Sequence, residues 1–580
     1  MEITFCGAAE SVTGSCHLIE VDGNGTQGDA MAKILLDCGQ FQGSAKQDAQ
    51  NFEAFPFDPA QIDLLILSHA HIDHCGRIPL LVKRGFRGRI YASRATADLL
   101  PVMLRDSAHI HETEAEWKNR KARRKGDQLV QPLFTAEDAE ASLAYVTPVL
   151  YDQPVEPLPG IRFSFVDAGH ILGSAIVELW AKESGKETKL VFSGDIGVTM
   201  RPILRDPTPV RSADVCIMES TYGNRLHEDG DVSLGRLEAI IRNTAARGGS
   251  IVIPSFAVGR TQELIYELNK FYENAPAGDL MRDIKVYIDS PMATAATEVF
   301  RNNIQDFDES ARQSILSGDD PLDFPTLVFT RSTEESKAIN SDPAPKIIIS
   351  ASGMCEAGRI RHHLKHHLWD KRTSVVFVGY QAEGTLGRKI VDGARSVLLF
   401  GEDVSVNAEI HSLEGFSAHA DRDGLLEWIG GFTKKPGQLF LVHGETAAKE
   451  ALAQTISEQL GLQPIVVREV SAFAVAAGGA EALLDTDNAP ASGGADIAAN
   501  PENNVEAEDA DRVLAKLTEI NENIERLIYE AKLAVKHSAA EGDEAAFGKL
   551  KTTVASLGND TMQLARALTG PAANGGDKNA

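Results

Sequence analysis

The sequence predicts an α/β protein of two or three domains. Short apolar runs, such as residues 64–67, end in polar or glycine-rich loops and are typical of buried strands. Between Asp214 and about Gly393 such runs alternate with helical stretches, which is the rhythm of a parallel sheet. The 580 residues, 43% hydrophobic and 24% charged, are enough for a sizeable core in each domain.

The loop after residues 64–67 contains three histidines and an aspartate within six residues: His69, His71, Asp73 and His74. Neutral imidazole and carboxylate are ligands that divalent zinc, iron or manganese accept. A polar turn with incidental histidines is the alternative, and the density of the motif argues against it. The glutamate of the helical HExxH pattern is absent, so the chain is not a zincin. We therefore expect a metal site at the C-terminal end of this strand, where open α/β sheets build their sites.

Three further residues of the same chemistry follow or end apolar runs. Asp37 ends Ile-Leu-Leu-Asp, His170 stands in Asp-Ala-Gly-His, and Asp195 stands in Phe-Ser-Gly-Asp. Taken singly, each is more often a turn residue or a hydrogen-bonded polar group. Taken in order after the histidine loop, they resemble the metallo-β-lactamase superfamily.

That resemblance implies an αββα sandwich with two metal ions bound by the loops at one edge. Asp37 would hold the metal loop in place. The implied first-metal ligands are His69, His71 and His170, those of the second metal are Asp73, His74 and a later histidine, and Asp195 bridges the two.

The second part of the chain predicts a separate α/β domain. Its strand candidates are residues 215–218, 250–253, 284–288, 346–349 and 375–378. Beyond residue 402 the chain returns to short strands and carries two more candidate functional histidines. We therefore expect the first domain to resume there, which makes the second domain an insertion.

Such an insertion resembles the β-CASP nucleases. Glu219 in Met-Glu-Ser-Thr-Tyr-Gly matches their motif A, His419 in Ser-Ala-His-Ala-Asp matches motif B, and His443 in Val-His-Gly-Glu matches motif C. The resemblance covers residues 1 to about 470. It is closest to the endonuclease subunit of the cleavage and polyadenylation factor and its prokaryotic relatives. A histidine at motif C implies RNA substrates, whereas the DNA-processing branch tends to carry valine.

The resemblance implies a ribonuclease of RNA processing or decay with two Zn²⁺ per chain. It would hydrolyse phosphodiester bonds of single-stranded RNA and leave 5' phosphate and 3' hydroxyl ends, by endonucleolytic or 5'-3' exonucleolytic cleavage. His443 would complete the second metal site, and His419, oriented by Glu219, would protonate the leaving 3' oxygen. The implied catalytic residues are Asp37, Asp73, Glu219 and His419. Two other classes stay open: a small-molecule metallohydrolase for a thioester or lactam, and a catalytically weak RNA-binding scaffold.

Three glycine-rich turns of the inserted domain are candidate phosphate sites. Backbone amides at a helix N-terminus favour an anion, and an arginine adds a bidentate donor. Plain βα turns are the alternative. Met354 stands where ribonuclease J enzymes, which bind a 5' monophosphate in a related pocket, tend to be polar, and this argues against a 5'-end sensor. The candidate substrate-binding residues are Arg260, Ser350, Ser352, Gly353 and Gln381.

Two helical segments carry clustered cations or histidines. Residues 109–127 have a helical period and a basic cluster, for which a solvated helix face and a polyanion contact are the two interpretations. Residues 361–367 contain histidines at i,i+4, a spacing that can bind metal. No carboxylate is evidently placed to orient those rings, so we expect a polar helix near the substrate groove. The cluster in the first segment is Arg120, Lys121, Arg123, Arg124 and Lys125.

The charge, the cysteines and the absence of long apolar runs limit the kinds of partner and location that we expect for the protein. The formal net charge of -26 argues against indiscriminate polyanion binding over the whole surface, although residues 481–511 alone contribute nine acidic residues. The six cysteines lack a CxxC pair, which favours reduced thiols. No apolar run is long enough to span a membrane and no signal peptide is evident, so we expect a cytoplasmic protein without a membrane partner.

The C-terminal part predicts a linker and a helical hairpin. Two apolar stripes with alternating spacings of four and three, within residues 513–531 and 547–568, would be exposed on single helices. The stripes would be buried against each other, against the nuclease body or against another copy of the chain. We expect a homodimer, with other RNA-processing proteins as further candidate partners; the alternative is a hairpin loosely tethered to a complete enzyme. The predicted parts are a metallo-β-lactamase domain (1–206 and 401–470), the inserted β-CASP domain (207–400), an acidic linker (471–511), the hairpin (512–570) and a disordered tail (571–580).

Overall fold

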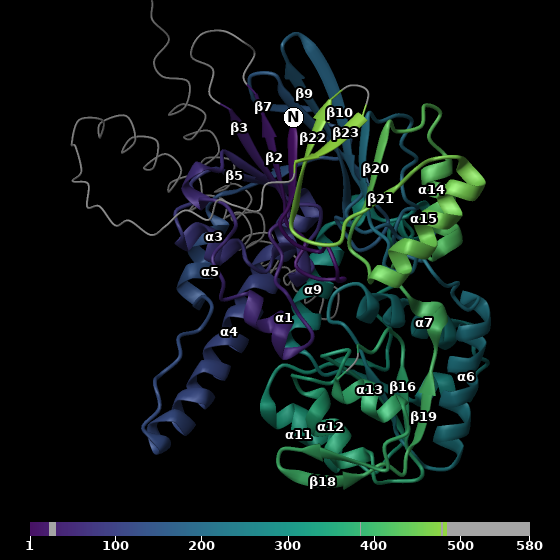
Figure 1. Ribbon diagram of the computed structural model, residues 1–580. Helices are drawn as coiled ribbons and strands as arrows, with labels where there is room; N and C mark the ends of the chain where they lie inside the picture. The colour runs from purple at the N-terminus through teal and green to yellow at the C-terminus, as the bar shows by residue number, and fades with distance from the viewer. Residues whose placement is uncertain (23–30, 383, 477–478, 484–580) are drawn as a thin grey trace, which may run out of the picture. The chain divides into compact units, whose positions relative to one another are not determined.

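The computed structural model describes residues 1–22, 31–382, 384–476 and 479–483 (Figure 1). Residues 23–30, most of the predicted linker, the predicted helical hairpin and the predicted tail lie outside the described residues. The two predicted α/β domains both lie within one compact unit, Met1–Asp485.

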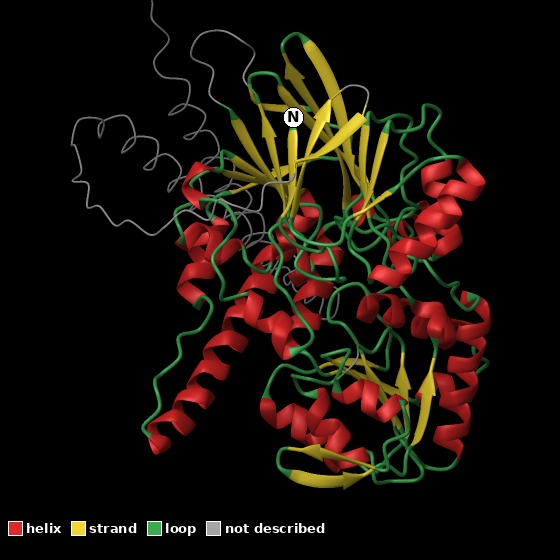
Figure 2. Ribbon diagram, in the orientation of Figure 1, coloured by secondary structure: helices red, strands yellow, loops and turns green. Residues whose placement is uncertain are grey.

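Two sheets face each other in the upper part of Figure 2 and form the expected sandwich. The first sheet has the order β23-β22-β1-β2-β3-β4-β5-β6 and the second β21-β20-β11-β10-β9-β8-β7. The strands of the first sheet are β1 (Glu2–Phe5), β2 (His17–Val21), β3 (Ala32–Leu36), β4 (Leu64–Ile66), β5 (Arg89–Ser93), β6 (Val146–Val149), β22 (Ser471–Ala476) and β23 (Gly479–Leu483). Those of the second are β7 (Val155–Leu158), β8 (Ile161–Asp167), β9 (Ala175–Glu183), β10 (Lys186–Phe192), β11 (Val215–Met218), β20 (Gln438–Leu441) and β21 (Ile465–Val466).

A core of aromatic and branched residues fills the space between the two sheets. Phe5, Phe165, Phe192 and Phe440 are buried there among aliphatic side chains of both sheets. The central strand β4 is buried on both of its faces, as its four-residue apolar run predicted, because helices cover the outer face. Burial of each such side chain stabilises the fold by roughly 1.5–3 kcal/mol relative to exposure.

Helices cover the outer face of each sheet. α3 (Ile78–Lys83), α4 (Arg94–Lys125) and α5 (Ala136–Leu143) pack on the first sheet, and α14 (Arg422–Gly430) and α15 (Thr446–Leu460) pack on the second. The remaining short elements of this domain are α1 (Ala45–Gln50), the 3₁₀ helix η1 (Pro59–Gln61), α2 (Ile72–Cys75) and η3 (Glu414–Phe416).

The inserted domain is a parallel sheet of order β14-β13-β15-β12-β16-β19 with helices on both faces. Its strands are β12 (Ile251–Pro254), β13 (Lys285–Ile288), β14 (Leu327–Phe329), β15 (Lys346–Ser350), β16 (Ser374–Phe377) and β19 (Glu409–Ser412), with a separate ribbon of β17 (Ser396–Leu399) and β18 (Glu402–Ser405). Its helices are α6 (Gly230–Ala246), α7 (Arg260–Asn274), α8 (Leu280–Asp283), α9 (Pro291–Asn302), η2 (Ile304–Asp306), α10 (Glu309–Leu316), α11 (Thr333–Ser341), α12 (Ile360–His367) and α13 (Leu386–Val391).

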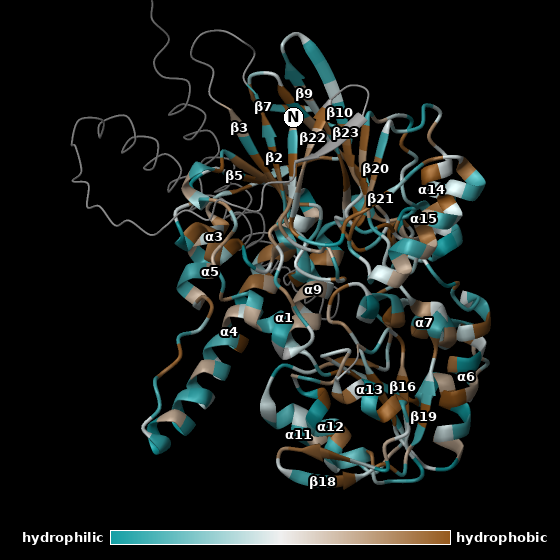
Figure 3. Cartoon of the chain, viewed as in Figure 1, coloured by the Kyte–Doolittle hydropathy of each residue, from teal (hydrophilic) through white to brown (hydrophobic). Residues whose placement is uncertain are grey.

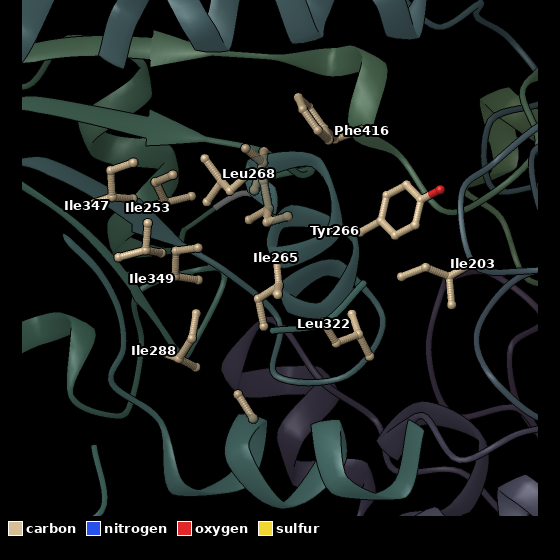
Figure 4. Packing of buried hydrophobic residues seen from close by; sticks show 14 of the residues in the cluster. Ile203, Ile253, Ile265, Tyr266, Leu268, Ile288, Leu322, Ile347, Ile349 and Phe416 are labelled. Atoms are coloured by element: carbon tan, nitrogen blue, oxygen red, sulfur yellow. The ribbon is translucent and has the colours of Figure 1, made fainter. Parts of the chain in front are cut away.

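The two domains share one hydrophobic core. Leu99 of α4 and Ile171 of the loop after β8 belong to the same buried cluster as Ile265 of α7. Figure 4 shows Ile203, from the loop between β10 and β11, beside Tyr266 of α7. The loops of the sandwich that face the insertion are therefore anchored by apolar contacts to the inserted domain.

Three segments form strands in a different sheet or part of the chain from the one that the sequence predicted. Val215–Met218 does not belong to the inserted sheet: it pairs in parallel with β10 and β20 of the sandwich. Conversely, β19, expected in the resumed domain, pairs with β16 of the insertion. Ser471–Ala476, expected in the linker, pairs with β1. A short apolar run shows that a strand exists but not which partner it joins, because pairing is fixed by contacts distant in sequence.

Candidate metal centre

The histidine loop leaves β4 at the edge of the first sheet and is tied down by its own backbone. His71 is the N-cap of α2, so Asp73 and His74 lie in the first turn of this short helix. Ser15 N donates to Asp73 O at 2.8 Å, and Cys38 N donates to His74 O at 2.8 Å. The neighbouring loop comes so close that a Cβ at Gly39 would lie 1.6 Å from Asp73 O. Only glycine fits there, which fixes the loop against the metal motif.

Asp37 holds the loop in the way the resemblance implied. Its carboxylate is fully buried and accepts from Ser68 N at 2.8 Å, Ser68 Oγ at 2.9 Å and Ser15 Oγ at 3.0 Å. His74 Nδ1 lies 2.7 Å from the same carboxylate. A proton on Nδ1 leaves His74 Nε2 with a free lone pair for a metal, as carboxylate partners of metal-bound histidines do.

The ligand atoms of the first predicted set lie at the separations of a tetrahedral site. His69 Nε2 and His71 Nδ1 are 3.1 Å apart, and His71 Nδ1 and His170 Nε2 are 3.2 Å apart. Asp195 Oδ2 lies 3.6 Å from Nε2 of both His69 and His170. Zinc bonds of ~2.0–2.1 Å at tetrahedral angles separate neighbouring ligand atoms by about 3.4 Å. The observed separations match this value to within a few tenths of an ångström.

The second set lies on the other side of the Asp195 carboxylate. His74 Nε2 is 3.3 Å from Asp195 Oδ2 and 4.0 Å from Asp73 Oδ2. His443 Nε2 is 3.6 Å from Asp73 Oδ2. Asp195 Oδ2 is thus close to both sets of ligand atoms, which is the position of a bridging carboxylate.

Unsatisfied polar atoms support a metal cofactor at this centre. His74 Nε2, His443 Nε2 and Asp195 Oδ1 are buried and, among the described residues, have no hydrogen-bond partner. Leaving one buried polar atom unpaired costs about 1–3 kcal/mol. Each of the three residues belongs to a group of imidazole and carboxylate side chains that could hold a cation, so bound cations would satisfy these atoms. The residues present therefore fit a metal cofactor.

Burial sets the protonation states that metal binding requires. It lowers the pKa of His69 and His170 well below the usual value and that of His71 to about 4, so these rings are neutral. Burial also opposes ionisation of Asp195, but the imidazoles of His443 and His74 outweigh it and hold the pKa of this carboxyl low. Neutral imidazoles and an ionised carboxylate are the forms that bind metal. His74 differs: burial lowers its pKa, but Asp195 and Asp37 outweigh it and raise this pKa well above the usual value, so a bound metal would displace a proton from this ring.

His443 is placed by a strained backbone turn directly after β20. Its φ of 49° is left-handed, and the turn is held because His443 N donates to Ala8 O at 2.8 Å and Ser220 N donates to His443 O at 3.2 Å. Thr221 Oγ1 lies 3.2 Å from His443 Nδ1 and so orients the ring. Non-glycine residues in this conformation cluster at functional sites.

Glu219 and His419 form a pair beside the ligands. His419 Nδ1 is 3.3 Å from the Glu219 carboxylate and 3.8 Å from Asp195 Oδ2. Glu219 is buried and accepts from Ile196 N at 2.6 Å, whereas the His419 side chain is 22% exposed. Burial lowers the pKa of His419, but Glu219 and Asp195 outweigh it and raise this pKa to about 9. The ring is therefore protonated near neutral pH and accessible from outside.

Arg260 is brought to the edge of the centre, where it is already paired. It begins α7, is buried, and contacts Glu263, which Arg201 also contacts. Burial lowers the pKa of its guanidinium to about 10. Arg260 and Arg201 line a small pocket together with His170. Two arginines against one glutamate leave this pocket with a net positive charge.

The other candidate phosphate residues mainly hold loops together. Ser350 Oγ donates to Asp289 O at 2.8 Å, and Ser352 Oγ lies 3.4 Å from Ala357 O. Gln381 Nε2 donates at 3.1 Å to Gly353 O, which joins the two turns that contain these residues. Their hydrogen-bonding groups are largely used within the protein, so their role toward substrate stays a prediction.

A carboxylate beside the histidines of α12 was missed in the sequence. Asp289, the residue after β13, is fully buried and lies 2.6 Å from His363 Nε2 and 2.6 Å from Arg359. His363 Nδ1 contacts Asn340 Oδ1 at 2.9 Å. The expectation that no carboxylate orients the histidines of α12 was wrong. The available signal was an aspartate directly after a parallel strand.

The fold and the donor set define a metal-dependent hydrolase of the metallo-β-lactamase type. Family models match residues 13–236 (metallo-beta-lactamase superfamily), 261–390 (Beta-Casp domain) and 403–467 (Zn-dependent metallo-hydrolase RNA specificity domain). Ribonuclease TTHA0252 of Thermus thermophilus is 36% identical over 457 residues, which cover 79% of this chain and 96% of that protein. Transcription termination factor FttA of Methanocaldococcus jannaschii is 30% identical over 491 residues, which cover 82% and 72%. The chain belongs to the β-CASP ribonuclease family of the metallo-β-lactamase superfamily.

Proposed function

We propose that the chain is a ribonuclease that binds two zinc ions and hydrolyses phosphodiester bonds of single-stranded RNA to 5' phosphate and 3' hydroxyl ends. The observation that carries the proposal is the Asp195 carboxylate, which lies between two sets of metal ligands and 3.8 Å from the protonated His419. The family membership and the name of the Thermus relative, a ribonuclease, support RNA as the substrate.

The proposed roles follow from the geometry of each side chain. His69, His71 and His170 would hold one zinc ion, Asp73, His74 and His443 the other, and Asp195 both. When bound, two divalent cations lower the pKa of an attacking water and neutralise phosphate charge. Within its ligand set Asp73 is the most exposed residue, with 21% of its side chain exposed against 4% for His443 and 1% for His74.

His419 would complete the reaction as a general acid. The attacking water would lose a proton to solvent and its oxygen would bond to phosphorus, the bond from phosphorus to the 3' oxygen would break, and a proton from His419 would neutralise the leaving oxygen. Because Glu219 holds Nδ1, the donated proton would come from Nε2. Glu219 thereby both orients the ring and keeps it charged, and neither role is needed by a hydrolase for small thioesters or lactams.

The structure supports the nuclease over the other two classes. A scaffold that had lost catalysis would be expected to lack ligands, yet every predicted ligand lies in one of the two sets. A homodimer, a cytoplasmic location and the bounds predicted for the helical hairpin and the tail remain proposals. Among the described helices, none is long and apolar enough to cross a membrane.

A substrate panel tests the proposal. The purified chain is incubated with end-labelled RNA, circular RNA, single-stranded DNA, and a generic lactam or thioester, with and without chelator, while zinc content is measured. Chelator-sensitive cleavage of RNA with about two zinc ions per chain is expected. Cleavage of circular RNA would assign endonucleolytic action, and turnover of the lactam or thioester without RNA cleavage would contradict the proposal.

A further inference from the structure

The outer part of α4 projects from the body of the molecule (Figure 1, lower left). α4 has 32 residues and is therefore ~48 Å long. Its first half is buried in the hydrophobic cores through residues such as Leu99, Met103 and Leu104. The last buried residue is Ala115, and none of residues 116–125 is buried. We call residues 116–132, the end of α4 and the segment that returns from it, the basic arm.

Hydrogen bonds make the basic arm a defined structure. Asn119 Oδ1 accepts from Val130 N at 2.8 Å, and Asn119 Nδ2 donates to Val130 O at 2.9 Å. This two-point contact holds the returning segment against the helix. Gly126 ends α4 in the left-handed conformation with its N–H bonded to Ala122 O, a normal helix C-terminus. The side chains on the arm are thus presented on a rigid helix.

Four side chains form one stripe along the exposed helix. Trp117, Arg120, Lys121 and Arg124 follow the spacing i, i+3, i+4, i+7, which places them on one face. Trp117 is 53% exposed, and Lys121 Nζ lies 3.4 Å from the centroid of its ring. The outer turns of α4 are otherwise hydrophilic (Figure 3). An exposed indole beside three cations is the combination that single-stranded nucleic acid binds, with a base on the ring and phosphates on the cations.

Within the part of the chain that the structure describes, the cations of the stripe have no acidic partner. Lys118, which lies off the stripe, is 3.6 Å from Glu114, but Arg120, Lys121 and Arg124 form no ion pair with any residue that the structure describes. Cations in the last turn of a helix interact favourably with the helix dipole, which accounts for the presence of Arg123, Arg124 and Lys125. The dipole does not account for Arg120, Lys121 or the exposed Trp117. In a chain with a net charge of -26, such a cluster is a local exception.

The base of α4 is attached to the metal centre. Ser93 Oγ, at the N-cap of the helix, and Thr96 Oγ1 both donate to Gly173 O in the loop that contains His170. At 1.5 Å per residue, the stripe begins ~35 Å and ends ~45 Å along the helix axis from this attachment. A single-stranded RNA that contacts both the metal centre and the stripe must therefore be longer than one that contacts the metal centre alone.

We propose that the basic arm is a second RNA-binding surface, on which Trp117 stacks on a base and Arg120, Lys121 and Arg124 contact phosphates outside the catalytic centre. This inference rests on the proposed ribonuclease function. Single-stranded RNA is favoured over an acidic protein because an acidic peptide offers no ring to stack on the exposed indole.

Binding is measured with the full chain in the His419→Ala background, so that RNA is not consumed. The test variant Arg120→Gln/Arg124→Gln removes two cations of the stripe. Its matched control Lys118→Gln/Arg123→Gln removes two cations from other faces of the same helix. Labelled single-stranded RNAs of about 5 and about 30 nucleotides span ~17 Å and ~100 Å at ~3.4 Å per nucleotide. Thermal unfolding of each variant checks that the fold is intact.

The long RNA should bind roughly tenfold more weakly to the stripe variant, with a salt slope lower by about 1.4, while the short RNA is unaffected. The control should lose much less. Trp117→Ala should weaken RNA binding but leave the binding of polyglutamate unchanged. Equal losses in the stripe and control variants would overturn the inference, as would a Trp117→Ala effect on polyglutamate. The parent chain with His419 intact separates the two proposals: if it does not cleave RNA the function fails, whereas cleavage with unchanged long-RNA binding in the stripe variant refutes only the arm.

Discussion

His419 Nδ1 lies 3.3 Å from the Glu219 carboxylate, and the two residues are 200 positions apart in the chain. Glu219 follows β11 and His419 follows η3, so the pair forms only when the chain resumes the sandwich after the insertion. The charge that raises the pKa of His419 to about 9 therefore depends on a tertiary contact.

His419→Ala should keep both metals and RNA binding while cleavage falls by roughly 10² to 10⁴, the usual range for one general acid. The side chain is outside both proposed ligand sets, so metal content measured by elemental analysis should equal that of the parent chain. His366→Ala, an exposed histidine of α12, is the matched control and should leave cleavage unchanged. Loss of zinc in His419→Ala would instead make His419 a ligand.

Glu219→Gln should shift the pH dependence of cleavage. A general acid works only while it is protonated, so activity in the parent chain should fall as the pH rises through the pKa of His419, which Glu219 raises. Removal of the Glu219 charge lowers the pKa of His419, and the fall should then begin at lower pH. The profile of kcat/KM against pH, measured at saturating zinc, tests this, and an unchanged alkaline limb would contradict the proposed pairing.

Asp195→Asn should lose both metals and cleavage. Without the bridging charge, two dications would repel each other at short range, and each would also lose a ligand. Asp73→Asn is the informative comparison, because Asp73 belongs to one ligand set and its loss should release about one zinc ion per chain. Retention of two zinc ions by Asp195→Asn would refute the bridge.

Asp167→Asn should stabilise the protein at alkaline pH. Burial raises the pKa of Asp167 to about 7, although Gly169 N–H and Arg205 oppose the shift. An aspartate with a raised folded-state pKa stabilises the fold fully below its unfolded pKa of ~3.9, and this stability is lost as the pH rises through about 7. The substitution keeps the oxygen that accepts from Gly169 and removes the charge.

The free energy of unfolding of Asp167→Asn should therefore exceed that of the parent chain by about 1–3 kcal/mol at pH ~8.5, and by less at pH ~5.5. Thermal or denaturant unfolding at the two pH values measures the difference. Asp403→Asn, at an exposed position of β18, controls for the general effect of removing one negative charge and should show no such pH dependence.

The metal centre could be predicted because four of its candidate ligands lie close together in the sequence. Three histidines and an aspartate in one loop have few other uses, and the order of His170 and Asp195 behind them added family context. The sequence could not show that His74 points Nδ1 toward Asp37 or that Thr221 orients His443, because these contacts join loops distant in the chain. They are set by tertiary packing.

The fold was predicted at the level of elements and missed at the level of partners. The strand at Val215–Met218 was correctly placed, but the prediction of its sheet was wrong, because neighbouring strands of the two domains have the same apolar composition. The histidines of α12 were recognised, whereas their carboxylate Asp289 was not, since the two lie 74 residues apart. Charge clusters and hydrophobic periodicity can be recognised from neighbouring residues. Strand order and ion pairing depend on residues that are distant in the sequence.

The shared hydrophobic core links the position of the His170 loop to the contact between the two domains. Ile171 and Leu172, next to this proposed ligand, are buried in the cluster that belongs mainly to the inserted domain. Any motion that parted the two domains to admit a strand would pull on these side chains and displace His170. Domain opening and zinc affinity would then be thermodynamically linked. If the closed arrangement binds zinc more tightly than the open one, bound zinc favours closure by the ratio of the two affinities. Bound zinc would therefore stabilise the contact between the two domains in addition to its part in catalysis.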